Sequence, residues 1–188
     1  MSADPLRLFV ALDLPAGVRD ALAAWGAQAA DGDPALRALA PQTLHVTLAF
    51  LGERPAWELD GLRAALHRSA GEAPAAVPLS LAGALWLSPR RPHVLTVGIG
   101  DASGALERLH RRLIGELGRE IGWEGEERPL RAHVTVARVR PGGTPRRTGL
   151  AGAPAAAFHA PAVTLYKSVL GPAGATHEPL ERIALPTA

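Results

Sequence analysis

Hydrophobic and polar residues alternate along two short stretches of the chain, residues 44–51 and 131–139. Alternation of this kind is typical of a β-strand with one face buried. Five further stretches are rich in strand-forming residues, and three have the 3.6-residue spacing of an amphipathic helix. The pattern predicts strands at 6–14, 44–51, 78–87, 93–99, 131–139, 162–170 and 180–185, and helices at 16–30, 57–69 and 103–121.

The predicted elements do not repeat as regular βα pairs. They follow the order βαβα, then ββαβ, then ββ, which is typical of an α+β fold and not of a doubly wound parallel sheet. Residues 141–161, rich in Gly, Pro, Ala and Arg, are predicted to form a loop. The chain has 188 residues, of which 47% are hydrophobic, and this is enough for one continuous core. We therefore expect a single domain spanning residues 1–188.

Composition removes several classes of function. The chain contains no cysteine, which excludes disulfides, thiolate metal sites and a cysteine nucleophile. The first residues lack a signal-peptide pattern, and no apolar run approaches the ~18 residues of a membrane helix, so we expect a cytoplasmic protein with no membrane partner. The formal net charge of +2 is too small for a strong duplex binder but permits a local basic cleft for a small anion.

One short pattern occurs twice, as Leu44-His-Val-Thr-Leu48 and as Ala132-His-Val-Thr-Val136. Residues two apart in a strand lie on the same face, so each histidine shares a face with its threonine while the apolar residues face the core. The two copies are 88 residues apart and each follows a predicted helix. We therefore expect two lobes related by a pseudo-two-fold axis, with facing strands that bring both motifs into one cleft.

Two histidines and two threonines in one cleft suit phosphoester chemistry. A neutral histidine can accept a proton from water while a protonated one donates a proton to the leaving oxygen, because the ordinary pKa lies near neutrality. Threonine hydroxyls can donate hydrogen bonds to the phosphate oxygens. A single His-Val-Thr in a strand is more often structural, and the repetition is what favours a functional site.

The sequence as a whole resembles the 2H phosphoesterase superfamily, named for two His-x-Thr-x motifs, and within it the RNA 2′,3′-cyclic phosphodiesterase (LigT-like) branch. The resemblance implies hydrolysis of an RNA 2′,3′-cyclic phosphate to a 2′-phosphate, and the reverse formation of 2′-5′ linkages without ATP hydrolysis. It covers nearly the whole chain, and it implies two pseudo-symmetric antiparallel sheets flanked by helices, with the motifs lining a central cleft. The segments that carry it are RLFVALDLP (7–15), LHVTLAFLGE (44–53), SPRRPHVLTVGI (88–99), RAHVTVARVR (131–140) and LYKSVLGPAGATHEPL (165–180).

The resemblance also assigns roles to residues. His45 and His133 match the catalytic histidines, and Thr47 and Thr135 match the phosphate-binding threonines. An aromatic residue after the first motif and an arginine after the second match Phe50 and Arg138, which imply base stacking and phosphate binding. Strict alternation places each of these two on the face opposite its histidine, unless a strand end or a bulge turns it inward.

In two places the chain departs from the family pattern. Ala132 stands where the family often has proline, which should change little. Ala38 and Ala40 stand where the family often has an aromatic residue, which puts base stacking on that side in doubt. The remaining histidines receive no role in this interpretation, and nothing in the pattern explains His159 or His177.

We expect no metal and no cofactor, a monomer, and RNA ends or cyclic nucleotides as partners. By resemblance, His133 activates water and His45 protonates the departing 3′ oxygen. Two alternatives stay open. One is another 2H activity on small cyclic nucleotides, and the other is a non-catalytic module that binds RNA ends.

Overall fold

The computed structural model describes residues 4–71, 76–88, 90–125, 129–171 and 174–186. Two of the segments quoted above contain residues outside these ranges: Pro89 in 88–99, and Pro172 and Ala173 in 165–180. The described elements comprise strands and α-helices, with short 3-10 turns at Pro41–Thr43 and Ala56–Glu58. They are β1 (Leu6–Leu12), α1 (Ala16–Gly32), β2 (Leu36–Ala38), β3 (Val46–Arg54), α2 (Leu59–Gly71), β4 (Pro78–Leu87), β5 (Val94–Gly100), α3 (Ala105–Ile121), β6 (His133–Val139), β7 (Ala157–His159), β8 (Ala162–Gly171) and β9 (Gly174–Ala184).

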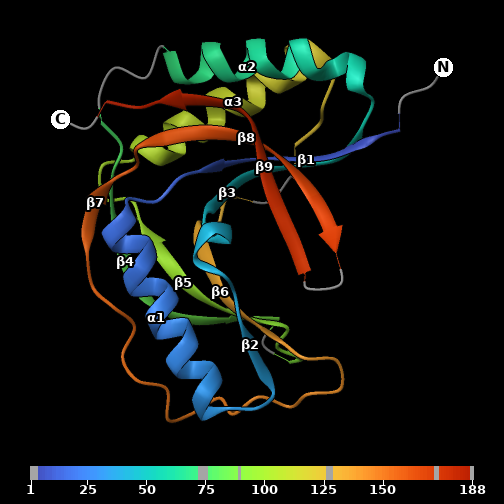
Figure 1. Ribbon diagram of the computed structural model, residues 1–188. Coiled ribbons are helices and arrows are strands. Elements are labelled where there is room, and N and C mark those ends of the chain that lie inside the picture. Colours follow the sequence, from blue (N-terminus) through green and yellow to red (C-terminus); the bar gives the residue numbers. More distant parts are fainter. Residues whose placement is uncertain (1–3, 72–75, 89, 126–128, 172–173, 187–188) are drawn as a thin grey trace.

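The α+β class is confirmed. The strands pair antiparallel in the order β7-β4-β5-β6-β3-β1-β8-β9, and β2 adds to β6 beside this path. The sheet curls, and the helices lie against its outer side (Figure 1). Sequential neighbours along the chain are therefore often not neighbours in the sheet.

The two expected sheets are joined at a narrow seam and form one continuous sheet. One half-sheet is β3-β1-β8-β9 and the other is β6-β5-β4-β7. They meet where β3 pairs with β6, and the register contains a single residue pair, Val46 with Val134. Each motif thus lies on the seam strand of its own half.

The pseudo-symmetry extends beyond the motifs. β1 and β5 have seven residues each and are offset by 88 positions, which is also the spacing of the two motif histidines. Each is followed by a 17-residue helix, α1 or α3, and then by a seam strand, β3 or β6, although β2 and the turn at Pro41–Thr43 are inserted between α1 and β3. The repeated unit is therefore β-α-β, and its last strand carries the motif.

The helices bury apolar stripes against the sheet. α1 packs on β2 and β6, whereas α2 packs on α3, β8 and β9. A Cβ at Gly26 would lie 2.9 Å from the Val136 carbonyl oxygen, so a glycine there allows α1 to approach β6 closely. The inner stripe of α3 is buried as predicted, through Leu106, Leu109, Leu113 and Leu117.

The structure differs from the predicted elements at short strands. β2 and β7 have three residues each, too few for a period to be seen, and β7 lies inside the stretch predicted as a loop. β9 begins at Gly174, six residues before the predicted strand, because its ladder with β8 continues through polar residues. Within the described ranges, no helix is both long and apolar enough to cross a membrane.

Candidate active site

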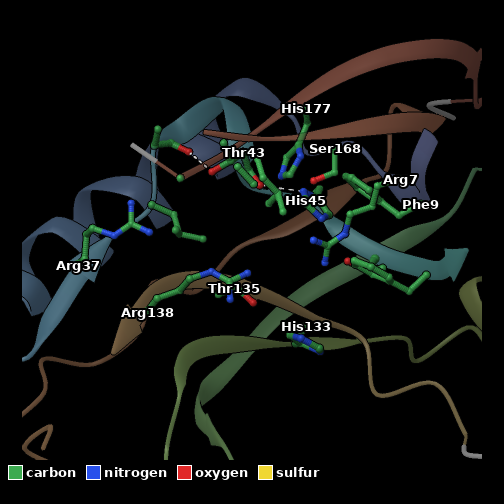
Figure 2. Close-up of a pocket in the computed structure, with 17 residues that line it drawn as sticks. Arg7, Phe9, Arg37, Thr43, His45, His133, Thr135, Arg138, Ser168 and His177 are labelled. Carbon is green, nitrogen blue, oxygen red and sulfur yellow. Dashed lines mark hydrogen bonds between the residues drawn. The ribbon is translucent and has the colours of Figure 1, made fainter. Parts of the chain in front are cut away.

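A cleft of about 430 Å³ opens at the seam between the two half-sheets. His45 and Thr47 line it from the β3 side, and His133 and Thr135 line it from the β6 side. Figure 2 shows the two histidines on opposite walls of this cavity. The structure therefore brings together the four residues that the repeated motif singled out.

His45 is held by a hydrogen bond from its ring to the backbone. Its Nδ1 lies 2.8 Å from the carbonyl oxygen of Thr43. That carbonyl belongs to the 3-10 turn Pro41–Thr43, in which the Thr43 hydroxyl donates to the Ala40 carbonyl at 2.7 Å. The turn thus presents a fixed acceptor to the histidine.

His133 repeats this geometry on the other wall. Its Nδ1 lies 2.7 Å from the carbonyl oxygen of Arg131, again two residues upstream. A carbonyl only accepts, so Nδ1 of each ring carries the proton and donates it. The neutral form of each ring then has its lone pair on Nε2, the nitrogen left for a substrate, and the protonated form can donate from the same atom.

Phe50 and Arg138 also line the cleft, although strict alternation predicts the opposite face. The reason is a bulge in each seam strand. The register skips Leu48 where β3 pairs with β1, and skips Val136 where β6 pairs with β5. The extra residue leaves two consecutive buried positions and reverses the phase, so the residue five after each histidine faces the cleft.

The two side chains differ in their surroundings. Phe50 is half exposed, its ring lies under the guanidinium of Arg7 at 5.4 Å, and it stacks beside Phe9 at 6.0 Å between centroids. Arg138 is exposed, and Figure 2 shows it close to Thr135. An aromatic platform thus lies on one side of the histidines and a cation on the other.

Rings surround His45. It stacks on Phe9 with centroids 4.8 Å apart, and the ring of His177 meets it edge-on at 5.2 Å. Tyr166 lies beyond Phe9 and donates its hydroxyl to Asp13 at 2.8 Å. These contacts exclude water from one face of the imidazole.

This packing lowers the pKa of His45 from 6.5 to about 4. Burial is the largest cause, because it penalises the charged ring, and the nearby His177 adds repulsion. The hydrogen bond to Thr43 and the charge of Asp13 act in the opposite direction and are weaker. His45 is therefore neutral at neutral pH in the free cleft.

The remaining wall of the cleft is basic. Arg37 and Arg138 line it, Arg7 lies on the opposite side of the cleft above Phe50, and none of the lining residues that the structure describes is a carboxylate. Over the same described residues, no three histidine, aspartate or glutamate side chains gather in a way that could hold a metal. A phosphate is the anion that such a set of guanidinium groups suits best.

Sequence reasoning missed five polar residues that line the cleft: Arg7, Arg37, Thr43, Ser168 and His177. Arg37 lies on the three-residue β2, and His177 lies on the polar first half of β9, neither of which showed a period. Arg7 and Ser168 lie on strands that were predicted, but a strand pattern alone does not say which strands border a cleft. The signal that was available for His177 is its place in a segment that carried the family resemblance.

Known proteins resemble this chain along most of its length. A model of the 2′-5′ RNA ligase superfamily matches residues 16–170. A protein of Geobacillus stearothermophilus named RNA 2′,3′-cyclic phosphodiesterase is 29% identical over 164 residues, which is 85% of this chain and 51% of that protein. One of the same name from Escherichia coli is 33% identical over 136 residues, 72% of this chain and 73% of that protein. The chain thus spans about half the length of the first relative and about three quarters of the second.

Solved structures show the same fold. The crystal structure of E. coli LigT in apo form superposes with a TM-score of 0.77 at 29% identity, covering 98% of this chain and 99% of that one. The same protein complexed with 3′-AMP gives a TM-score of 0.76 at 28% identity, covering 96% and 98%. The curled antiparallel sheet is therefore that of these neighbours.

Proposed function

Because the chain belongs to the 2′-5′ RNA ligase superfamily of 2H phosphoesterases, we propose that it hydrolyses the 2′,3′-cyclic phosphate at RNA ends to a 2′-phosphate. The single observation that carries the proposal is the pair of histidines on opposite walls, each with Nδ1 bonded to a carbonyl and each with a threonine two residues on. The names of the curated relatives support the same substrate class.

The proposed step is an in-line displacement at phosphorus. One neutral histidine takes a proton from water as the water oxygen bonds to phosphorus. The bond from phosphorus to the 3′ oxygen breaks, and the other histidine protonates that oxygen. Thr47 and Thr135 donate to the non-bridging oxygens and hold the phosphate between the two rings.

The neighbourhood of the rings suggests which histidine does which. With the base on the platform formed by Phe50 and Arg7, the ribose and its 3′ oxygen lie on the His45 side and water enters on the His133 side. His45 must then be protonated, although its pKa in the free cleft is about 4. A phosphate anion about 4 Å away contributes about 4 kcal/mol at an effective dielectric of about 20, a rise of about three in the pKa. Substrate binding is therefore enough to restore the proton to His45.

The direct test is the product. An RNA oligonucleotide that ends in a 2′,3′-cyclic phosphate is incubated with the enzyme, and the product is assigned by phosphorus NMR. We expect a 2′-phosphate and a free 3′ hydroxyl. A 3′-phosphate would contradict the assignment of the leaving oxygen and leave the two-histidine chemistry standing, whereas binding without turnover would favour the alternative of an RNA-end binding module.

Reverse 2′-5′ ligation is proposed on the same geometry. In ligation an RNA 5′ hydroxyl takes the place of the attacking water. Its oxygen bonds to phosphorus as the bond to the 3′ oxygen breaks, the histidine that would accept the water proton accepts the hydroxyl proton, and the other histidine protonates the 3′ oxygen. The test is incubation of a cyclic-ended strand with a 5′-hydroxyl strand in the absence of ATP. Ligated product that resists an enzyme specific for 3′-5′ linkages would support it.

A further inference from the structure

Two arginines stand opposite each other at one end of the cleft. β2 and β6 pair antiparallel with Arg37 directly across from Arg138, and both side chains line the cavity. Like charges directly opposite in a sheet destabilise it. Residues that break a stability rule of this kind are concentrated at functional sites, where binding compensates for the cost.

The pair lies on one side of the catalytic residues. In Figure 2, Arg138 lies beside Thr135, and Arg37 lies beyond it, away from Arg7 and the two histidines. The Thr47 and Thr135 hydroxyls and the two imidazoles already surround the position of the scissile phosphate. Arg37 is therefore placed to meet a group farther along a bound chain.

Two elements define the place of Arg37. Its backbone is fixed by the ladder with β6, and its guanidinium lies against the first residue of β9. A Cβ at Gly174 would lie 3.1 Å from Nη1 of Arg37, and the φ of Gly174 is +121°, a conformation that favours glycine. The backbone of β9 thus leaves room for this arginine at the edge of the cleft.

Charge indicates the ligand. No carboxylate faces the cleft within the described ranges of the chain, so an anion bound at Arg37 meets positive charge from both strands. The planar fork of arginine matches two oxygens of a phosphate. Arg37 lies outside the position of the scissile phosphate but in the same cleft. This place fits a second phosphate of the same polymer.

We propose that Arg37 binds the internucleotide phosphodiester next to the scissile cyclic phosphate, while Arg138, which lies beside Thr135, contacts the scissile phosphate itself. The substrate is then an RNA oligonucleotide end, and a 2′,3′-cyclic mononucleotide is a poorer substrate. The proposal rests on the proposed function. It adds a preference of the enzyme for oligonucleotide ends over mononucleotides.

The test removes the charge from each partner in turn. kcat/KM is measured for 2′,3′-cyclic CMP, for a dinucleotide ending in a 2′,3′-cyclic phosphate, and for the same dinucleotide with a neutral methylphosphonate linkage. Each is measured with the wild-type enzyme, with Arg37→Gln and with Arg37→Lys. The matched control is Arg111→Gln on α3, an exposed arginine outside the cleft that pairs with Glu107.

For the wild type we expect kcat/KM for the natural dinucleotide to exceed kcat/KM for the methylphosphonate by about tenfold. This is the size expected of a charge-assisted contact at a partly exposed site. In Arg37→Gln this ratio should fall to near one, and Arg37→Lys should lie between, because it keeps the charge without the fork. The ratio in the wild type should also shrink as salt rises. Arg111→Gln should behave as the wild type.

Two outcomes would overturn the proposal. One is an Arg37→Gln enzyme that loses the same factor on all three substrates, and the other is a wild type that does not distinguish the two dinucleotides. Failure of the proposed function looks different, because the wild type would then turn over none of the three. Circular dichroism of each variant separates loss of fold from loss of binding.

Discussion

The two histidines of the cleft share one local geometry and differ in what surrounds them. Each bonds through Nδ1 to the carbonyl two residues upstream, and each seam strand carries a bulge at the same offset. His45 packs against Phe9 and His177, whereas no ring contact involves His133 among the residues that the structure describes. One imidazole is therefore shielded from water and the other is not.

The difference comes from the β8–β9 hairpin. It supplies Tyr166 and His177 to the β3 half. The corresponding outer strands of the other half are β4 and β7, and β7 has only three residues. A repeated motif thus fixes the backbone and the reactive groups, and an unrepeated hairpin adds the His177 ring that, together with burial, lowers the pKa of His45.

The largest expected effect is from removing either histidine. His45→Ala and His133→Ala should each lower turnover by at least about 10², because a positioned acid or base typically contributes about 10²–10⁴. The double variant should lose less than the product of the two single losses, since the two residues act as a unit. Steady-state turnover of a cyclic-ended substrate gives these values.

The matched control is His159→Ala, an exposed strand histidine on β7 that does not line the cleft. It should keep wild-type turnover. Near-normal turnover in either motif variant, with the fold intact by circular dichroism, would contradict two-histidine catalysis.

The next comparison concerns the equivalent positions Phe50 and Arg138. Arg138→Gln should lower kcat/KM by about 10- to 100-fold on every substrate with a cyclic phosphate, because a hydrogen bond to a charged group contributes about 1.5–3 kcal/mol. Phe50→Leu should lower it by about tenfold on nucleotides, since stacking contributes about 1–3 kcal/mol per base. On ribose 2′,3′-cyclic phosphate, which has no base, Phe50→Leu should have little effect. Equal losses in the two variants on the baseless substrate would contradict this division of roles.

A smaller effect tests the lowered pKa of His45 directly. His177→Gln removes a repulsive charge beside His45 and should raise the pKa of His45 from about 4 toward its ordinary value. The pH profile of kcat/KM is expected to be bell-shaped. Its acid limb moves to higher pH if His45 is the base, and its alkaline limb moves to higher pH if His45 is the acid. A profile with neither limb moved would show that His177 does not act on His45.

The smallest expected effect is from chelation. We expect full turnover after exhaustive treatment with EDTA, because two imidazoles and the arginines supply the acid, the base and the positive charge that the proposed step requires. The same preparation assayed with added Mg²⁺ or Zn²⁺ is the control. Loss of turnover that one metal restores would overturn metal independence.

The sequence predicted most of the architecture because long periodic segments are controlled by burial. The α+β class, all three α-helices and the longer strands other than β9 were predicted to within a few residues. The repetition of one motif, 88 residues apart, was enough to place His45, Thr47, His133 and Thr135 in a common cleft. Such repetition is visible because side-chain alternation is a local property.

What could not be predicted depends on non-local pairing. Alternation placed Phe50 and Arg138 on the wrong face, because a bulge is set by the partner strand and leaves no mark in the pattern. Arg37 and His177 were missed because β2 and the first half of β9 become strands through their ladders with β6 and β8. Tertiary pairing here overrides local propensity.

The narrow seam between the half-sheets has a thermodynamic consequence. Among the described residues, the β3–β6 ladder contains one residue pair, Val46 and Val134, so few backbone hydrogen bonds between these two strands hold the walls of the cleft at a fixed separation. An anion that contacts both motifs bridges the walls and binds the folded state alone. By mass action such a ligand adds about 2.7 kcal/mol of stability at a hundred times its Kd. The melting temperature should therefore rise with the concentration of inorganic phosphate, and it can serve as a measure of how much of the cleft is occupied.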